Sequence, residues 1–476
     1  MVRNAWLSVC FSLVMVCSLG CGADDGTGGA TGEETGAEET GAEETGAEET
    51  GEPECTSNSD CSDGDGCTID TCTLEGICAY GYLDDCCTTA EDCAPSEVAC
   101  VVVECVAHFC VDNLSNCSGG NVTVETLAGT GEQGWVDGPA ETAMFFDPFG
   151  IAVGSDGTVY VTDLMGMTVR AISGGIVSTH AGGANTVPGK SGVLHLPPTF
   201  AGFQDGMAEE ALFDMPVSLA AGAEGQLVVA DMGNHAIREV LDGWVTTIAG
   251  QAAKTSTPPS LGGGFLNGLA EEAYFAWPSG VLIQEDGGLL VSDTMNHCIR
   301  RIADGGVTTW AGVCEETGFL DGPSETALMA QPGQLAWGPD GSVYVADTGN
   351  HAIRRIADGV VSTLVGSDVD NCPAGTDLIS GCHADGPIAT ASLSLPVGVA
   401  VDPDGGVYIS EQAGNRISRV VAGTLWTVAG TGEAGHVDGE GAQAQFNLPA
   451  QIALGSDGVL RVVDRLNQRI RTVTLF

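Results

Sequence analysis

A pair of opposite charges recurs along the C-terminal three-quarters of the sequence, with the acid seven residues before the base. The pairs are Asp163 and Arg170, Asp231 and Arg238, Asp293 and Arg300, Asp347 and Arg354, and Asp464 and Arg471. An acid that ends one strand can face a base that begins the next across the hairpin between them. The sixth copy has Glu411 and Ser418 instead. Because a catalytic site needs a unique constellation, this repetition indicates a structural ion pair.

Three histidines stand at equivalent positions of the same repeat. They are His235, His297 and His351. Packed sheets lie about 10 Å apart and a zinc–nitrogen bond is about 2 Å long, so equivalent turns cannot easily share one metal ion. We therefore expect these histidines to be structural.

An Asp or Asn followed by Gly also recurs six times. The six residues are Asp137, Asp205, Asn267, Asp321, Asp385 and Asp438. A ring of carboxylates would bind cations, but Asn267 replaces Asp in one copy, which a charge-dependent site would resist. A helix N-cap permits that exchange, because either side chain accepts a backbone N–H bond. We predict that each residue caps a short helix.

Each of these turn residues opens a longer repeat. An Ala follows six residues later, then a large apolar residue, and then Pro148, Pro216, Pro278, Pro332, Pro396 or Pro449. Short apolar segments follow each Pro, and in the fourth unit they predict strands at 334–337, 343–347, 352–357 and 360–365. Four short strands per unit, repeated radially, make a propeller blade. We predict an all-β fold, a six-bladed β-propeller over residues 119–476.

The two ends of the predicted propeller complement each other. The sixth unit has its third strand at 469–475 and no fourth strand after it, while residues 122–129 match the fourth-strand pattern. We predict that this N-terminal strand completes the C-terminal blade. Such closure protects sheet edges that otherwise invite aggregation.

The repeat resembles the NHL family in all six units. The pairs Asn234-His235, Asn296-His297 and Asn350-His351 occupy the position of the family's Asn-His-Leu tripeptide. The resemblance implies a six-bladed propeller that serves either binding or catalysis. Gluconolactonase-like propellers hold a divalent ion with Glu, Asp and Asn, and an NHL-like peptide-amidating lyase holds zinc with His.

Residues just after each Pro should approach the mouth of the central channel. They are Phe149-Gly150, Val217-Ser218, Ser279-Gly280, Gly333-Gln334, Val397-Gly398 and Ala450-Gln451. None is acidic or His, so neither metal-ligand set of the related enzymes is found at these positions. We expect no catalytic residue and no cofactor here.

The N-terminus has the pattern of an export signal. Arg3 precedes a short apolar stretch, and Ser18-Leu19-Gly20-Cys21 resembles the lipobox of bacterial lipoproteins. The resemblance implies a signal peptide over 1–21 and lipidation of Cys21. Residues 22–54 repeat Thr-Gly-Ala-Glu-Glu, which predicts a disordered acidic tether. Ordinary cleavage with free secretion is the alternative.

Twelve cysteines follow the tether, in two tandem sets of six within residues 55–118. The first set is Cys55, Cys61, Cys67, Cys72, Cys78 and Cys86, and the second is Cys87, Cys93, Cys100, Cys105, Cys110 and Cys117. An even number at repeated spacing in an exported chain predicts two small disulfide modules. Their connectivity stays open.

Three further features are candidates for metal binding, cross-linking or specificity. Asp63, Asp65 and Asp70 weakly resemble a calcium loop, although an Asp- and Gly-rich turn explains them better. Cys372 and Cys382 are expected to pair, and Cys298 and Cys314 are a further candidate pair. Single-blade insertions span 184–201, 251–264 and 367–383. We expect binding specificity to reside in such loops.

The charge balance limits the partners. The formal net charge is −49, with 64 acidic and 15 basic residues. Such a field repels nucleic-acid phosphates and anionic lipid, so no nucleic acid is expected, and membrane contact only through a lipid anchor. The sequence predicts an outer-membrane or cell-surface lipoprotein, or a secreted protein, that presents a propeller to a protein or polysaccharide ligand. The alternatives are a metal-dependent hydrolase or lyase and a polysaccharide-binding surface protein.

Overall fold

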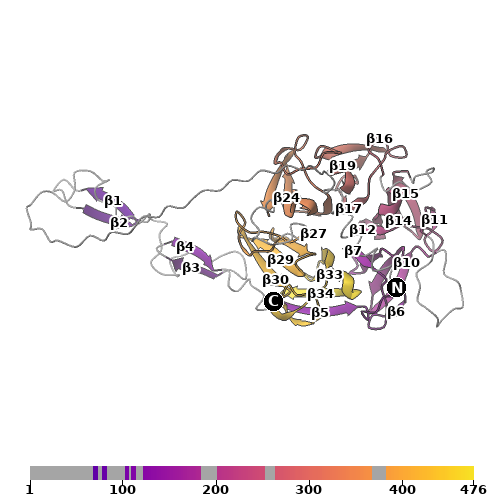
Figure 1. Cartoon of the computed structure of the whole chain (residues 1–476), viewed down its shortest axis with the longest axis horizontal. Coiled ribbons are helices and arrows are strands. Elements are labelled where there is room, and N and C mark those ends of the chain that lie inside the picture. The colour runs from indigo at the N-terminus through magenta and orange to yellow at the C-terminus, as the bar shows by residue number, and fades with distance from the viewer. Residues whose placement is uncertain are drawn as a thin grey trace, which may run out of the picture. The chain divides into compact units, whose positions relative to one another are not determined.

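The computed structural model describes residues 122–183, 201–251, 263–366 and 382–475, and the backbone of four earlier strands. The chain divides into two compact units, with the boundary at Asn116 and Cys117. The larger unit contains six five-stranded antiparallel sheets arranged around a common centre (Figure 1). The predicted all-β, six-bladed propeller is therefore confirmed.

Each blade begins with a strand at the ring centre. These inner strands are β7 (Pro148–Val153), β12 (Pro216–Ala221), β17 (Pro278–Ile283), β22 (Pro332–Trp337), β27 (Pro396–Val401) and β32 (Pro449–Leu454). Each contacts the inner strands of both neighbouring blades, and β32 contacts β7, which closes the ring. A Cβ on Gly280 would lie 2.2 Å from the Gly333 carbonyl oxygen, so glycine permits this close approach.

The chain then runs outward through the blade. The second strands are β8 (Val159–Asp163), β13 (Leu227–Asp231), β18 (Leu289–Asp293), β23 (Val343–Asp347), β28 (Val407–Glu411) and β33 (Leu460–Asp464). The third strands are β9 (Thr168–Ser173), β14 (Ala236–Leu241), β19 (Cys298–Ala303), β24 (Ala352–Ala357), β29 (Arg416–Val421) and β34 (Arg469–Leu475). The fourth strands are β10 (Ile176–Ala181), β15 (Trp244–Ala249), β20 (Gly306–Ala311), β25 (Val360–Val365), β30 (Thr424–Ala429) and β5 (Val122–Ala128).

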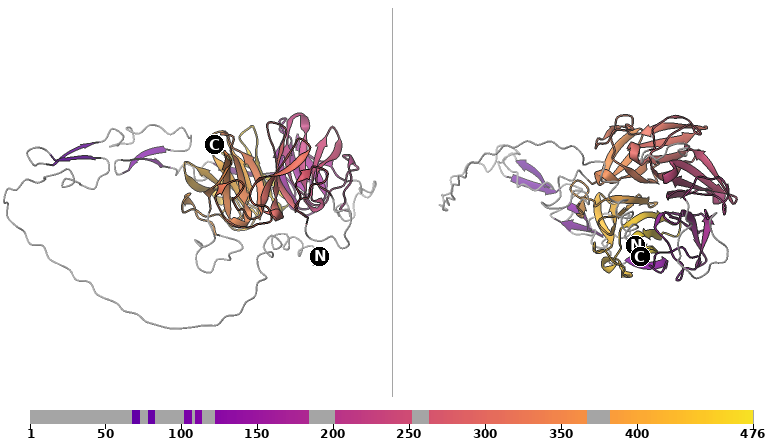
Figure 2. Two further views of the ribbon diagram at one scale, coloured as in Figure 1. Left: turned by 90° about the horizontal axis from the view of Figure 1, so that it is seen from above. Right: turned by 45° about the vertical axis from the view of Figure 1, so that its right-hand side comes forward.

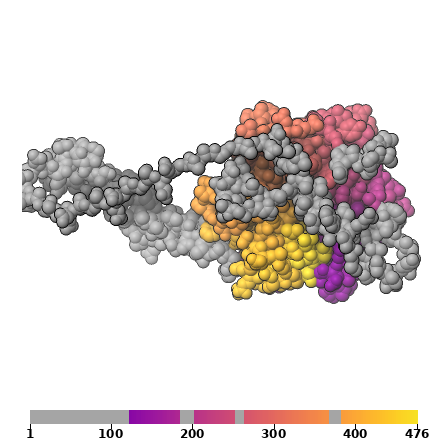
Figure 3. Space-filling view, in the orientation of Figure 1, coloured from indigo at the N-terminus to yellow at the C-terminus, as the bar shows by residue number. Residues whose placement is uncertain are grey.

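The predicted closure is present in the last blade. β5 pairs with β34 from Leu475 opposite Val122 to Ile470 opposite Ala128. The start of the propeller therefore lies directly against its end, as the space-filling view also shows (Figure 3). Val124 of β5 is fully buried in this blade, so closure adds to the core as well as to the hydrogen bonding.

A two-residue strand forms the outer edge of each sheet. These strands are β6 (Gly138–Pro139), β11 (Gly206–Met207), β16 (Gly268–Leu269), β21 (Gly322–Pro323), β26 (Gly386–Pro387) and β31 (Gly439–Glu440). The predicted helix N-caps at the preceding Asp or Asn are therefore wrong. The Gly that follows each one takes an extended backbone with positive φ, for example 138° at Gly138, and leads into a strand.

Short 3₁₀ turns are the helical elements of the described residues. They are η5 (Ala223–Gly225), η6 (Met232–Asn234), η7 (Thr294–Asn296), η8 (Thr348–Asn350), η10 (Gly441–Gln443) and η11 (Arg465–Asn467). Four of them, η6, η7, η8 and η11, directly follow the acid that ends a second strand. The turned views show how the blades stack side by side around the ring (Figure 2).

The smaller unit contains two hairpins that share one plan. β1 (Thr68–Cys72) pairs with β2 (Cys78–Tyr82), and β3 (Val102–Val106) pairs with β4 (Phe109–Asn113). Cys72 is the register partner of Cys78, and Cys105 is the partner of Cys110. In both tandem sets these are the fourth and fifth cysteines, so the two sets repeat in backbone structure as well as in spacing.

Candidate functional site

The repeated acid–base pairs lie deep inside the blades. Arg354 donates from Nη1 to Asp347 at 2.7 Å and from Nη2 to Asp321 at 2.6 Å, and both Arg354 and Asp347 are fully buried. The same guanidinium donates to the carbonyl oxygens of Leu328 and Leu320. We call this arrangement the arginine clasp. It joins the second strand, the third strand and the outer loop of one blade.

The clasp recurs with small variations. Its arginines are Arg170, Arg238, Arg300, Arg354 and Arg471. In blade 3, Asn267 accepts the outer bond from Arg300 at 2.7 Å, which explains why Asn can replace Asp there. Burial raises the pKa of Asp231 to about 7, although Arg238 acts in the opposite direction. The Ala and the large apolar residue of each repeat pack beneath the clasp. In blade 2, the Arg238 guanidinium lies 5.1 Å from the centre of the Phe213 ring.

Blade 5 replaces the arginine with a histidine from another part of the blade. His383 Nδ1 lies 2.9 Å from Glu411 Oε1, and its Nε2 lies 3.3 Å from Asp385 and 2.9 Å from Thr427 Oγ1. Ser418, at the arginine position, donates to Glu411. Burial by itself lowers the pKa of His383, but hydrogen bonds to Asp385 and Glu411 outweigh it and raise the pKa to about 9. His383 therefore bridges the same two acids as an imidazolium.

The three repeated histidines connect neighbouring blades. The backbone N–H groups of Trp277, Gln331 and Leu395 donate to Nδ1 of His235, His297 and His351 at 3.1–3.2 Å. In blade 5, Asn415 Oδ1 accepts the same bond from Leu448 at 2.9 Å. Burial lowers the pKa of all three histidines, as a neutral acceptor nitrogen requires. The structure assigns each of them a bond between blades.

A hollow on the ring axis opens on the face where the inner strands begin. Its cavity volume is about 30 Å³, it is narrow, and every blade contributes to it. Its apolar lining consists of Phe149, Val217, Met232, Trp277, Met295, Leu395 and Val397. Its polar lining consists of Ser279, Thr294, Gln334, Thr348, Gln412, Gln451 and Arg465. We call this hollow the axial pocket, and its volume is enough for a few ordered water molecules.

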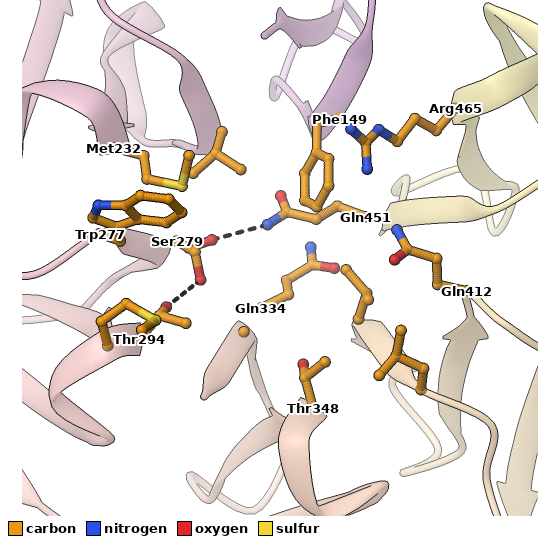
Figure 4. Close-up of a pocket in the computed structure, with 15 residues that line it drawn as sticks. Phe149, Met232, Trp277, Ser279, Thr294, Gln334, Thr348, Gln412, Gln451 and Arg465 are labelled. Atoms are coloured by element: carbon orange, nitrogen blue, oxygen red, sulfur yellow. Dashed lines mark hydrogen bonds between the residues drawn. The ribbon is translucent and has the colours of Figure 1, made fainter. Parts of the chain in front are cut away.

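Two glutamines reach across the channel (Figure 4). Gln451 of blade 6 donates from Nε2 to the Ser279 carbonyl oxygen of blade 3 at 3.1 Å. Gln334 of blade 4 donates to the Ile452 carbonyl oxygen at 2.8 Å and accepts from the N–H groups of Val399 and Ile452. Gln451 thus ties two opposite blades together, Gln334 ties blade 4 to blades 5 and 6, and both place neutral amides in the channel.

Arg465 is the charged member of the described lining. It forms two bonds to Asp147, Nε to Oδ1 at 2.8 Å and Nη2 to Oδ2 at 3.0 Å, and both side chains are buried. Its guanidinium also lies 5.1 Å from the centre of the Phe149 ring. Because this paired carboxylate neutralises the guanidinium, the pocket presents no net charge to a ligand.

The sequence predicted part of this lining. Residues after the inner-strand Pro, including Phe149, Val217 and Gln451, do line the pocket. Sequence analysis missed Met232, Thr294, Thr348, Gln412 and Arg465, each directly after the acid that ends a second strand. That acid marks where the chain turns back at the face on which the pocket opens. The repeat therefore contained enough information to predict that the next residue lines the pocket.

The described residues on either side of the three insertions lie on this same face. Strands alternate in direction, so β10, β15 and β25 end on the face where the inner strands begin. The described neighbours of the insertions follow those strands: Gly183 and Ala201, Gln251 and Gly263, and Gly366 and Cys382. Residues 184–200, 252–262 and 367–381 lie outside the described residues.

The structure describes only some of the residues in the cysteine and metal predictions. Cys298 and Cys314 form a disulfide with an S–S distance of 2.01 Å, and Cys382 is disulfide-bonded. Asp70 lies in β1 opposite Tyr80. Cys372, Asp63, Asp65, Cys21 and the cysteines of the two sets outside β1–β4 lie beyond the described residues. Within those residues, no group of three His, Cys, Asp or Glu side chains could hold a metal ion.

The fold defines a six-bladed β-propeller with a small pocket on its axis, and comparisons relate it to NHL repeat proteins. No family model matches the chain. It is 31% identical over 287 residues to Protein SUPPRESSOR OF QUENCHING 1, chloroplastic, of Arabidopsis thaliana, over 58% of this chain and 26% of that protein. It is 27% identical over 304 residues to NHL repeat-containing protein 2 of Bos taurus, over 58% of this chain and 41% of that protein. The chain thus spans less than half the length of these relatives.

Solved structures share the fold. A structural genomics protein of unknown function from Bacteroides thetaiotaomicron superposes with a TM-score of 0.54 and 21% identity, over 80% of this chain and 84% of that one. An auxiliary nutrient binding protein from Bacteroides ovatus gives a TM-score of 0.52 and 16% identity, over 74% and 76%. No described helix of this chain has the length and apolar character needed to cross a membrane.

Proposed function

We propose that this chain is an exported, surface-tethered binding protein whose propeller holds a ligand at the mouth of the axial pocket. The lining of that pocket carries the proposal. It combines an apolar wall with neutral amides and hydroxyls, and its described cation is already ion-paired. Side chains of this kind fix a ligand by contact and hydrogen bonding.

Two further observations support the proposal. The described residues that flank the three insertions lie on the face where the pocket opens. Non-equivalent loops on one face of a rigid scaffold commonly determine binding specificity. In addition, a propeller of the same fold is described as an auxiliary nutrient binding protein, so this architecture is compatible with ligand capture.

The enzyme hypothesis has no comparable support in the described residues. A metal-dependent hydrolase or lyase would place carboxylates or imidazoles around the channel, whereas the described lining carries amides, hydroxyls and apolar groups. We therefore propose binding without turnover. A polysaccharide remains one of the ligand classes to be screened.

A thermal-shift screen of the full chain against peptides, oligosaccharides and small metabolites tests the proposal. Leu395 precedes Pro396 at a backbone φ of 52°, and Trp277 occupies the same position in blade 3 at 54°. Leu395→Trp should therefore fold and fill the pocket. Leu448→Trp, at the equivalent position of blade 6 outside the lining, is the matched control. We expect ligands that stabilise wild type and Leu448→Trp but not Leu395→Trp.

The same ligands also separate binding from catalysis. After incubation with the protein, each ligand should keep its mass. Conversion to a product, lost in Leu395→Trp, would contradict the proposal and favour an enzyme. For the tether, we expect Cys21→Ser to move the protein from the membrane fraction to the soluble fraction. An unchanged distribution would refute lipidation at Cys21.

A further inference from the structure

A groove lies on the propeller face opposite the mouth of the axial pocket, along the turns that join first and second strands. It consists of two open hollows with volumes of about 590 Å³ and 440 Å³. Trp337, Gly338 and Pro339 line both hollows, so the two adjoin at the end of β22. We call them together the tryptophan groove. Each hollow, unlike the axial pocket, has a volume typical of ligand sites.

Trp337 breaks the sixfold pattern on this face. The last residue of the inner strand is aliphatic in every other blade, namely Val153, Ala221, Ile283, Val401 and Leu454. The indole reaches blade 3, where its Nε1 donates to the Ile283 carbonyl oxygen at 2.9 Å. The side chain is only partly buried and lines the groove. Because its one donor is already engaged, Trp337 offers a ligand aromatic surface rather than a hydrogen bond.

Two acids stand beside this ring in the larger hollow. Asp286 accepts from the Gly288 N–H at 2.9 Å and from Arg301 Nη2 at 2.5 Å, so its charge is neutralised. Glu285 is exposed, lines the same hollow, and has no hydrogen bond or ion pair within the described residues. No basic residue lines this hollow, which therefore carries negative charge. A free carboxylate next to an aromatic face favours a cationic ligand.

The smaller hollow is mainly apolar. Its lining includes Pro339, Val401, Pro403 and Leu454 beside the single hydroxyl of Ser456. Its acid, Asp402, already accepts from two backbone N–H groups and from the Arg419 guanidinium. The hydroxyls of a saccharide would find few free partners against this wall. An apolar group suits this hollow better.

We propose that the tryptophan groove binds a short extended peptide segment in which a Lys or Arg stands two residues from an apolar residue. Alternate side chains of an extended peptide lie about 6.6 Å apart on one side, so one can enter each adjoining hollow. The stem of the basic side chain packs on Trp337, and its charge lies beside Glu285. The net charge of −49 further favours the approach of basic segments. This site goes beyond the proposed function, because it lies on the other face and takes a different ligand.

Titration of the full chain with three probes tests the inference. The probes are acetyl-Lys-Ala-Leu-amide, the same peptide with norleucine in place of lysine, and a neutral hexasaccharide of glucose. In protein labelled with ¹⁵N-tryptophan, the indole signal that is lost in Trp337→Leu reports on the groove. We expect the lysine peptide to shift it, the uncharged peptide to bind about tenfold more weakly, and the hexasaccharide to leave it unmoved. Equal affinities of the two peptides, no shift with the lysine peptide, or a shift with the hexasaccharide alone would overturn the proposal.

Three variants locate the effect by calorimetry with the lysine peptide. Glu285→Gln should weaken binding about fivefold. Glu224→Gln removes an exposed charge from the corresponding turn of blade 2, outside the groove lining, and should leave binding unchanged. Trp337→Leu introduces the residue type that blade 6 has at this position, so it should fold, and it should weaken binding at least about tenfold. Unchanged affinity in Glu285→Gln and Trp337→Leu would refute the site.

The two measurements together exclude binding elsewhere on this acidic chain. Heat of binding without a shift of the Trp337 signal would place the peptide on another acidic surface and contradict the proposal. Failure of the lysine peptide leaves the proposed function standing, because that function is tested with ligands that Leu395→Trp excludes.

Discussion

The arginine clasp and the axial pocket are built from the same six repeats, but they differ in how closely the repeats agree. At the clasp, five blades place an arginine between two polar anchors. At the pocket, the residue after the second-strand acid changes in nearly every blade. The six residues are Leu164, Met232, Thr294, Thr348, Gln412 and Arg465. The clasp is therefore the structural frame that the blades share, whereas the side chains near the ring axis differ from blade to blade.

Blade 5 is the exception within the frame. Its His383 bridges Glu411 and Asp385, as arginine does in the other blades, but an imidazolium can lose its proton within an ordinary pH range. The comparison therefore predicts that the clasp of blade 5 loses its cation as pH rises through about 9, whereas the guanidinium of the other clasps keeps its charge.

The largest loss of stability should come from opening an arginine clasp. Arg354→Ala leaves Asp347 buried without its cation, and we expect about 3–5 kcal/mol of destabilisation. The neighbouring Arg355 forms a partly exposed pair with Asp340, so Arg355→Ala should cost at most about 1 kcal/mol. Chemical denaturation measures both. Equal losses for the two variants would show that the clasp does not frame the blade.

Removing the histidine of blade 5 should cost less than removing an arginine. In His383→Ala, Glu411 still accepts from the Ser394 N–H and from Ser418, so its charge keeps two donors. We expect a loss of about 2 kcal/mol at pH 6. The same denaturation measurement checks it, and a loss as large as that of Arg354→Ala would mean that the remaining donors do not compensate.

The pH dependence of stability should isolate the same histidine. Its folded-state pKa of about 9 lies above the ordinary value of 6.5, so its contribution is complete below pH 6.5 and disappears as pH rises through 9. We expect a decline on the order of 2 kcal/mol over this range in wild type. The decline should be absent in His383→Gln. Parallel curves for the two proteins would contradict the role assigned to His383.

The histidines that connect neighbouring blades should have a smaller effect on the pH dependence of stability, and their contribution should decrease as pH falls rather than as it rises. Burial lowers the pKa of His351, so its bond to the Leu395 N–H is complete above pH 6.5 and weakens as pH falls. Asn415 makes the same bond in blade 5. His351→Asn should therefore preserve stability at pH 7, while His351→Leu should lose about 1 kcal/mol. A large loss in His351→Asn would show that the ring does more than accept this bond.

The smallest change in stability, and a gain rather than a loss, should come from a substitution in the axial pocket. Gln412→Leu removes a buried donor without a partner, so the ligand-free protein should gain up to about 1 kcal/mol. Its melting temperature should rise slightly. A clear loss of stability would instead show that Gln412 has a structural role in holding the blades together.

Sequence repetition predicted the frame almost to the residue. In blade 4 the predicted strands at 343–347, 352–357 and 360–365 match β23, β24 and β25, because turn residues punctuate each one. The outer loops were misassigned as helix caps because Asp and Asn favour both caps and turns. Their true partner, Arg354 for Asp321, lies 33 residues away and no local pattern reveals it.

The residues of the axial pocket could be predicted from the sequence only in part, for a related reason. Proximity to Pro placed Gln451 at the channel mouth, but its bond to the Ser279 carbonyl oxygen spans 172 residues and depends on ring closure. Similarly, His383 lies at the edge of an insertion, outside the repeat that supplies the other clasps. Contacts made by closure across the ring follow from the assembled fold rather than from spacing.

Hydrogen–deuterium exchange of the full chain, with and without a ligand from the thermal-shift screen that Leu395→Trp excludes, tests most directly whether the axial pocket is the binding site. The account predicts protection at the start of β17, β22 and β27 and in η7 and η8, around Ser279, Thr294 and Thr348. Protection confined to the opposite hairpin turns, beside Trp337 and Pro339, or to the outer strands would contradict it.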